Sequence, residues 1–287
     1  MCGIAGYVSK EDRSFYLQAM VDKLGHRGPD MQKILTDSTS SYIGLGHTRL
    51  SIQDLSSAGT QPMQSSNARF VISYNGEIYN FQDIKNKLDN QFSISWKGHS
   101  DTEVLLNSIS FLGLHETLKI IKGMFAFALL DKKENTLILA RDPFGEKPLY
   151  FSHQNNTLIF ASELKALRVN VDFEFNLCHD SLSLFLRYNS IPAPHTPYSH
   201  VFKLEPGNIL FFDIENSDIT SKKYIDLISL FNESQESFFD ESYEDALKAT
   251  ENLLTQSVIG QLSSDVPLGC FLSGGIDSST IAALMQE

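Results

Sequence analysis

The sequence predicts a layered mixed α/β (α+β) fold, followed by the beginning of a second α/β unit. Continuous apolar, β-prone runs recur between turn signals, which is typical of strands covered on both faces. Segments with apolar residues at helical spacing lie between these runs and are expected to form outer layers. Near the C-terminal end an apolar run leads into a glycine-rich loop and a helical pattern, which predicts the second unit.

Composition narrows the class of protein. A chain of 287 residues suffices for one large domain or two ordinary ones, and 42% hydrophobic with 20% charged residues is typical of soluble globular proteins. The net charge of −12 argues against nucleic acid or an anionic membrane as a partner. A signal pattern is missing, the three cysteines lie far apart and the eight histidines show no metal-ligand spacing. We therefore expect a cytoplasmic protein with reduced thiols and no metal site.

The N-terminal pair Met1-Cys2 is a candidate nucleophile. Removal of Met1 would leave Cys2 with a thiol and a free α-amine on one carbon. The thiolate is a strong nucleophile, and an α-amine with a pKa of about 7.7–8.0 can take its proton near neutral pH. Taken alone, a residue so close to the terminus is more often disordered and inert.

The first elements are a strand over 3–8 and a helix over 15–24 that ends at Gly25, followed by a polar loop over 26–30. A strand-like run over 42–52 carries a lone arginine, Arg49. Such an arginine is usually a paired residue at the edge of the core. Its guanidinium also suits the binding of a carboxylate, because it offers a planar fork of donors.

Asn75-Gly76 lies between apolar runs within residues 70–79. This dipeptide is the leading signal of a two-residue β-hairpin, so a turn is expected there. It also suits an oxyanion hole, because Asn offers an amide donor and Gly lets a main-chain N–H come close. A tight turn would present both donors, so the two interpretations are compatible.

Residues 98–106 predict the start of a helix. Ser100 and Glu103 fit a capping box, and Asp101 falls in the first turn, where the helix dipole favours a carboxylate. A residue that merely begins a helix is the default interpretation of Asp101. The alternative is a carboxylate that binds the ammonium of a ligand.

The middle of the chain completes the expected layers. Strands are predicted over 123–131, 136–142, 149–151 and 158–161, with a turn at 143–148. Helices near 101–112, 162–168 and 180–188 are expected to cover the strands, and prolines mark an irregular loop over 192–197. A last hairpin is predicted over 201–204 and 208–212, around the turn 205–207.

A polar stretch divides the chain. We expect a first domain over 2–215, a linker over 216–240 and an incomplete second domain over 241–287. Ser242 is the predicted cap of a long helix, and residues 266–272 read as a short buried strand. The loop Ser-Gly-Gly-Ile-Asp-Ser-Ser at 273–279 then combines free N–H groups, hydroxyls and a helix N-terminus, as phosphate-binding loops do.

These motifs, taken together, resemble the class II, N-terminal-nucleophile glutamine amidotransferases, and most closely the glutamine-hydrolysing asparagine synthetase family. The motifs are Cys-Gly-Ile at 2–4, His-Arg-Gly-Pro-Asp at 26–30, Gly-His-Thr-Arg-Leu-Ser-Ile at 46–52, Asn-Gly-Glu-Ile-Tyr-Asn at 75–80, Ser-Asp at 100–101, Gly-Met-Phe-Ala-Phe-Ala at 123–128, Arg-Asp at 141–142, Lys-Pro-Leu-Tyr at 147–150, Ala-Ser-Glu at 161–163 and the 273–279 loop. The resemblance implies a four-layer α/β/β/α sandwich of the N-terminal-nucleophile hydrolase type, then a linker and an ATP-pyrophosphatase-type domain.

The resemblance also implies roles for single residues. Cys2 attacks the glutamine side-chain amide and releases ammonia, while the Asn75 side chain and the Gly76 N–H hold the oxyanion. Arg49 binds the α-carboxylate of glutamine and Asp101 its α-ammonium. The glutamine pocket is completed by Glu77, Leu50, Ser51 and Ile52, and ATP would meet Leu262, Ser273, Gly274, Gly275, Asp277 and Ser278.

Glutamine hydrolysis needs no cofactor in this family, whereas the complete synthetase uses ATP with Mg²⁺. Its acceptor is aspartate by default, in asparagine biosynthesis, although relatives amidate other carboxylates such as sugar acids of surface polysaccharides. A non-catalytic glutamine-binding fragment is a further alternative. A phosphoribosyl-transferring amidotransferase shares the N-terminal half, but the 273–279 loop argues against it. The family also leaves a homodimer open.

The sequence departs from the family at its C-terminal end. Family synthetase domains continue for hundreds of residues beyond the phosphate loop, whereas this sequence stops at Glu287. We therefore expect a fragment of a longer synthetase. Apolar faces within 243–287 would then lack partners, which predicts local disorder or aggregation there.

Overall fold

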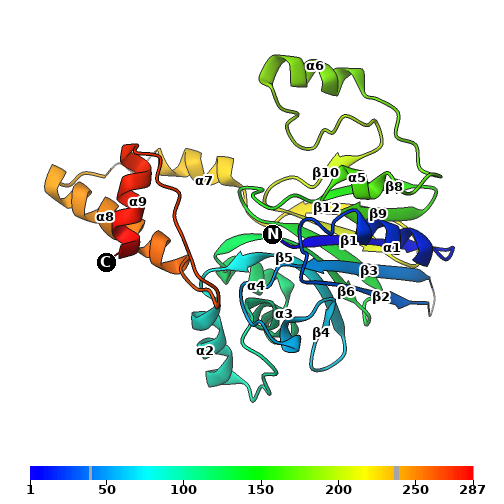
Figure 1. The fold of residues 1–287 in the computed structure, drawn as a ribbon, viewed down its shortest axis with the longest axis horizontal. Helices are drawn as coiled ribbons and strands as arrows, with labels where there is room; N and C mark the ends of the chain where they lie inside the picture. The colour runs from blue at the N-terminus through cyan, green and yellow to red at the C-terminus, as the bar shows by residue number, and fades with distance from the viewer. Residues whose placement is uncertain (39–40, 236–238, 287) are drawn as a thin grey trace.

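Two antiparallel sheets form the centre of the molecule in the computed structural model, which describes residues 1–38, 41–235 and 239–286 (Figure 1). The first sheet has six strands in the order β10-β8-β9-β1-β3-β2. Its strands are β1 (Gly3–Ser9), β2 (Met31–Asp37), β3 (Tyr42–Arg49), β8 (Tyr150–Gln154), β9 (Thr157–Ala161) and β10 (Phe202–Lys203).

The second sheet also has six strands, in the order β12-β11-β7-β6-β5-β4. They are β4 (Met63–Gln64), β5 (Phe70–Ile78), β6 (Gly123–Asp131), β7 (Thr136–Arg141), β11 (Asn208–Asp213) and β12 (Ile219–Lys223). A short 3-10 turn, η1 (Ser57–Gly59), lies in the connection from β3 to β4.

Helices cover the outer face of each sheet, as Figure 1 shows. On the first sheet lie α1 (Ser14–Asp22) and α5 (Leu164–Leu167); on the second lie α2 (Phe81–Gln91), α3 (Asp101–Leu112) and α4 (Leu114–Ile120). Three apolar cores result, one between the sheets and one under each helical layer. This arrangement confirms the α/β/β/α sandwich, because both faces of each sheet are buried.

The hairpin expected at Asn75-Gly76 is wrong. Strand β5 continues straight through both residues, and they pair with Ala126 and Phe125 of β6. A Cβ on Gly76 would lie 2.4 Å from the Met124 carbonyl oxygen, so the glycine allows close backbone approach rather than a turn. The Asn-Gly dipeptide looks the same in sequence whether it forms a turn or lies in a closely packed strand. Only the pairing with a partner strand distinguishes the two structures.

The hairpin expected over 201–212 is also wrong. Strand β10 pairs with β8 in the first sheet, whereas β11 pairs with β7 and β12 in the second. The chain therefore crosses between sheets at 204–207 instead of turning back on itself. The pairing with β12 also carries the second sheet past residue 215, the predicted end of the first domain.

Helix α6 (His179–Tyr188) does not join an outer layer. It stands at the end of an extended excursion, clear of both sheets, at the top of Figure 1. Phe185, Leu186 and Tyr188 are exposed on it. The sequence periodicity thus predicted the helix but not its place, because amphipathic spacing does not say which surface a helix meets.

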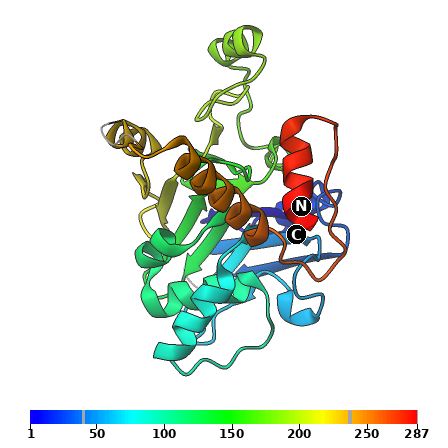
Figure 2. The ribbon, with the colours of Figure 1, turned by 90° about the vertical axis from the view of Figure 1, so that its left-hand side faces the viewer.

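The C-terminal part forms a second group of helices. After α7 (Leu227–Ser234), α8 (Tyr243–Gly260) and α9 (Ile276–Gln286) contact each other, apart from the sheets, and Figure 2 shows them from that side. The strand expected over 266–272 is wrong: these residues belong to no helix or strand, and Phe271 is fully exposed. No helix in the described part of the chain is both long and apolar enough to cross a membrane.

Candidate active site

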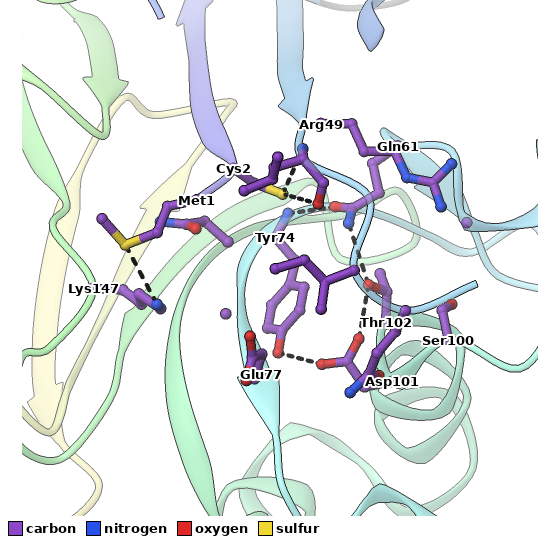
Figure 3. Close-up of a pocket in the computed structure, with 16 residues that line it drawn as sticks. Met1, Cys2, Arg49, Gln61, Tyr74, Glu77, Ser100, Asp101, Thr102 and Lys147 are labelled. Atoms are coloured by element: carbon purple, nitrogen blue, oxygen red, sulfur yellow. Dashed lines mark hydrogen bonds between the residues drawn. The ribbon is translucent and has the colours of Figure 1, made fainter. Parts of the chain in front are cut away.

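A cavity of about 80 Å³ lies where the start of β1, the end of β3, the middle of β5 and the start of α3 meet (Figure 3). These elements bring together residues that are far apart in the sequence. Predicted site residues that line the cavity are Cys2, Arg49, Leu50, Ile52, Asn75, Gly76, Glu77 and Asp101. Ser51 does not line it; its N–H instead donates to Asp30 Oδ2 at 2.7 Å.

Cys2 directly precedes β1, an inner strand of the first sheet. Its Sγ accepts a hydrogen bond from the Leu50 N–H at 3.4 Å, and its carbonyl accepts one from Arg27 Nε at 2.9 Å. Arg27 is itself fixed by an ion pair to Glu163 at 2.9 Å. Burial raises the pKa of the Cys2 thiol, against the lowering effect of the Leu50 N–H. The thiol therefore needs a base before it can act as a nucleophile.

Met1 lies in the same cavity, and Lys147 Nζ donates to its sulfur at 3.6 Å (Figure 3). Burial lowers the pKa of the Met1 α-amine, and the positive charges of Arg27 and Lys147 lower it further, against the opposing effect of Cys2. An amine at this place is thus kept closer to its neutral form, which is the form that accepts a proton.

Asn75 lines the cavity and carries a donor without a partner in the described part of the chain. Its Nδ2 is buried and has no hydrogen-bond partner among the described residues. A buried amide donor without a partner costs free energy, so such a group in a native fold calls for an explanation. Because Asn75 and Cys2 line one cavity, a negatively charged oxygen formed at a Cys2-bound carbon would satisfy this donor.

Arg49 is buried at the end of β3. Its Nη1 donates to the Ser56 carbonyl at 2.8 Å, and its Nη2 donates to the Asp54 carbonyl. A guanidinium carries five N–H donors, so three remain for a carboxylate. The loop that follows β3 therefore orients the Arg49 fork without using all of it.

Asp101 lies across the cavity, in the first turn of α3. Its Oδ2 accepts from the Tyr74 hydroxyl at 2.7 Å and from the Ile78 N–H at 2.9 Å. Burial raises the pKa of Asp101, although these hydrogen bonds lower it in part. Burial also raises the pKa of Glu77, against the charge of Lys147. A ligand ammonium would offset the cost of burying these carboxylates.

The Ser100 cap of α3 forms as predicted, since its Oγ accepts from the Glu103 N–H at 3.3 Å. The second half of the expected capping box does not form. The Glu103 carboxylate instead accepts from the Lys97 N–H at 2.8 Å and from the Gly98 N–H at 2.9 Å. Glu103 thus fixes the loop that enters α3 and so helps to place Asp101.

Several residues of this site were not predicted to have a role. Arg27 and Lys147 belong to motifs that carry the family resemblance, but neither was a predicted site residue. Gln61 orients Tyr74, because its Oε1 accepts from the Tyr74 N–H at 2.7 Å and its Nε2 donates to Thr102 at 3.2 Å. These contacts join segments distant in sequence, so local spacing carries no signal for them.

The predicted phosphate loop lies apart from this cavity and is exposed. Ser273 N–H and Oγ lie 3.3 and 3.0 Å from Ser278 Oγ, and Gly274 has a φ of +83°, which favours glycine. Asp277 lies in the first turn of α9. Leu262 lines a separate cavity of about 260 Å³ between α8 and α9. Among the described residues, the structure holds no cluster of metal-ligating side chains.

Comparison with known proteins agrees with this geometry. Residues 1–225 match the glutamine amidotransferase domain, and residues 249–287 match asparagine synthase. The chain is 35% identical to a Methanocaldococcus jannaschii protein provisionally named asparagine synthetase [glutamine-hydrolyzing] 2, over 100% of this chain and 57% of that protein. It is also 35% identical to asparagine synthetase [glutamine-hydrolyzing] 1 of Bacillus subtilis, over 100% of this chain and 44% of that protein.

The chain thus spans about half the length of the curated relatives it matches. A solved structure of glutamine phosphoribosylpyrophosphate amidotransferase from B. subtilis, complexed with ADP and GMP, superposes with a TM-score of 0.59. That likeness covers 78% of this chain and 49% of the other at 22% identity, and it shows the fold alone. By the match over residues 1–225, the chain belongs to the glutamine amidotransferase domain family.

Proposed function

We propose that the region over residues 1–225 hydrolyses the side-chain amide of glutamine at Cys2. One observation carries the proposal: Asn75, whose buried Nδ2 has no hydrogen-bond partner among the described residues, lines the same cavity as Cys2. A nucleophile and a donor without a partner around one cavity suit acyl transfer through a tetrahedral oxyanion. The family match over residues 1–225 supports the same chemistry.

In the proposed first step, the α-amine of Cys2, freed by loss of Met1, takes the thiol proton. The thiolate forms a bond to the amide carbon, and the carbonyl electron pair moves onto oxygen, where Asn75 Nδ2 and the Gly76 N–H hold it. The carbon–nitrogen bond then breaks. The leaving nitrogen takes the proton from the α-ammonium and departs as ammonia.

In the second step, water attacks the thioester that remains on Cys2, with the α-amine accepting its proton. The same donors hold the second oxyanion. Its collapse breaks the carbon–sulfur bond, returns the proton to sulfur and releases glutamate. Each proton taken by the amine is given back, so the cycle needs no further reactant.

Recognition of glutamine is proposed to use the charges at the ends of the cavity. The remaining donors of Arg49 bind the α-carboxylate, and the buried Asp101 carboxylate binds the α-ammonium. Glu77, Leu50, Ser51 and Ile52 complete the pocket. Although Ser51 does not line the cavity, its N–H bond to Asp30 fixes the main chain of Leu50 and Ile52 on either side.

The ammonia is proposed to serve an ATP-dependent amidation of a carboxylate, with aspartate as the acceptor by default and Mg²⁺ accompanying ATP. The two relatives named above are called asparagine synthetases, which supports this acceptor. ATP would activate the carboxylate. Its phosphates would be held by Ser273, Gly274, Gly275, Asp277 and Ser278, and its base would lie near Leu262. A homodimer and a cytoplasmic location belong to the same proposal.

A second candidate is a module that binds glutamine without turning it over. The presence of Arg49 and Asp101 around the cavity favours it, because these charges can bind an amino acid even if Met1 is retained and the Cys2 nitrogen stays in a peptide bond. The two candidates differ in one property, which is whether glutamate is released.

Two variants with different kinetic effects test the proposal. Asn75→Ala removes an oxyanion donor, so kcat for glutamate release falls about 100-fold or more, with little change in KM. Asp101→Asn removes the charge that faces the ammonium, so it chiefly raises KM. Release of glutamate and ammonia by the purified chain measures both. No turnover in the wild-type chain, with glutamine binding intact, would favour the binding module.

A further inference from the structure

The chain returns from α8 to the loop that follows β3, and residues 263–265 contact this loop. Gln53 Nε2 donates to the Ser263 carbonyl at 3.2 Å, and the Asp265 N–H donates to the Ile52 carbonyl at 2.9 Å. Ile52 and Gln53 both line the glutamine cavity. A segment that leads directly to the phosphate loop therefore touches the lining of the first site.

Asp265 makes the central contacts. Its Oδ2 accepts from the Asp54 N–H at 2.6 Å and lies 2.7 Å from His99 Nε2. His99 in turn donates its main-chain N–H to Asp54 Oδ2 at 2.9 Å. A Cβ on Gly98 would lie 2.0 Å from that same Asp54 oxygen, so the three residues meet in a tightly packed corner.

This corner adjoins both charged residues proposed to hold glutamine. The Asp54 and Ser56 carbonyls orient the Arg49 guanidinium. His99 comes just before the Ser100 cap and Asp101 at the start of α3. Asp265 is thus bonded to one segment that places Arg49 and to another that places Asp101.

The contacts of Asp265 are partly exposed, as is typical of an interaction that can form and break, and not of a buried core. The Asp54 side chain is 1% exposed, whereas those of His99 and Asp265 are 59% and 39% exposed. An exposed ion pair contributes little to folding stability, but a charge-assisted bond to a main-chain N–H is directional and holds the loop geometry. Residues 266–272, which follow, belong to no helix or strand, so no regular element directly follows Asp265.

We propose that Asp265 is a positioning residue for the glutamine site, through which the segment before the phosphate loop sets the affinity for glutamine. This inference rests on the proposed roles of Arg49 and Asp101. Asp265 holds the loop over 52–56 and the start of α3 at the spacing at which Arg49 and Asp101 can bind the same glutamine molecule. When residues 263–265 move away, Arg49 and Asp101 both lose a contact that helps to position them. By linkage, glutamine in the cavity also favours the docked position of this segment.

The test compares Asp265→Ala and Asp265→Asn with a matched control, Glu251→Ala, which removes the same charge from an exposed position on α8. Glutamine hydrolysis gives KM and kcat. Calorimetry of glutamine binding in a Cys2→Ala background gives Kd without turnover.

We expect Asp265→Ala to raise KM and Kd about tenfold, the effect of losing one charge-assisted hydrogen bond, and to leave kcat within about twofold. Asp265→Asn keeps an oxygen that can accept from the Asp54 N–H, so its effect is smaller. Equal KM and Kd in Asp265→Ala and in Glu251→Ala overturn the inference, and so does a loss confined to kcat.

The two proposals fail differently. Wild-type turnover with no effect of Asp265→Ala removes the positioning role and leaves the glutaminase in place. No turnover, together with glutamine binding that Asp265→Ala weakens, supports the positioning role and overturns the glutaminase. No turnover by the wild-type chain, together with no binding of glutamine to the Cys2→Ala protein, overturns both.

Discussion

The two regions of this chain bury their apolar residues very differently. Residues 1–225 close three apolar cores within a four-layer sandwich, and side chains such as Phe125, Phe127 and Phe160 are at most 1% exposed. Among the described residues of 243–286, Val258 is the one apolar side chain that is buried. Within the described residues, the first region thus closes its cores, whereas residues 243–286 leave most of their apolar side chains outside a core.

This difference teaches where the geometry of each site comes from. In the first region, residues of the cavity are fixed by strands and helices that pack on both sides of them. In the second, the phosphate loop is ordered by local bonds such as that between Ser273 and Ser278. We therefore expect the first region to behave as a cooperative folding unit and the second to respond locally.

Aromatic truncations give the largest contrast. Phe125→Ala removes a fully buried ring under the second sheet and should lower the free energy of unfolding by about 3–5 kcal/mol. Phe271→Ala removes a ring that is 100% exposed and should change it by less than about 0.5 kcal/mol. Urea unfolding followed by fluorescence measures both. Equal effects of the two substitutions would contradict the difference in burial between the two regions.

Acid should destabilise the first region in a defined way. His47 is buried in β3 and lies 3.1 Å from the Tyr74 carbonyl, and burial lowers its pKa from 6.5 to about 4. The folded state keeps His47 neutral while the unfolded state takes up a proton below 6.5. The contribution of neutral His47 to the free energy of unfolding is therefore fully present above pH 6.5. It is lost as the pH falls to about 4, which lowers the free energy of unfolding by about 3 kcal/mol.

Unfolding free energies measured between pH 7 and pH 4 test this, with His47→Gln as the comparison. We expect the variant to show a shallower loss over the same window, since Gln keeps a donor for Tyr74 but has no proton to gain. An identical pH slope in both proteins would mean that other groups govern the acid response.

Two helix caps give the smallest contrast. Ser100 caps α3 and is buried, whereas Ser242 caps α8 on the exposed side. Ser100→Ala should lower the global unfolding free energy by about 1 kcal/mol, the usual worth of an N-cap. Ser242→Ala should speed hydrogen exchange within α8 and leave the global value unchanged. A global loss from Ser242→Ala would show that the two regions unfold together.

The sequence predicted most elements of the first region because their patterns are local. The helix expected over 101–112 and the strands over 123–131 and 136–142 lie where apolar spacing placed them. What failed depended on partners distant in sequence. Asn75-Gly76 has the composition of a turn, yet pairing with β6 keeps it straight, and residues 266–272 have the composition of a strand but pair with no other strand among the described residues.

The same distinction holds for the site. Their chemistry made Cys2, Arg49 and Asp101 candidates, the family resemblance assigned their roles, and the structure brings them around one cavity. The supports of these residues carried no local signal. Arg27 holds the carbonyl of Cys2 from a loop, and Asp265 reaches the loop behind Arg49 from the far end of the chain. Such roles arise from long-range packing, which spacing along the sequence does not encode.

The central claim is that Cys2, freed of Met1, is the nucleophile of a glutamine site. The most direct measurement is the intact mass of the chain after incubation with diazo-oxo-norleucine, an electrophilic glutamine mimic, with Cys2→Ala as the control. We predict a single adduct on a chain that lacks Met1, and no adduct on the variant. A chain that keeps Met1 and stays unmodified, or an adduct that persists in Cys2→Ala, would contradict the account.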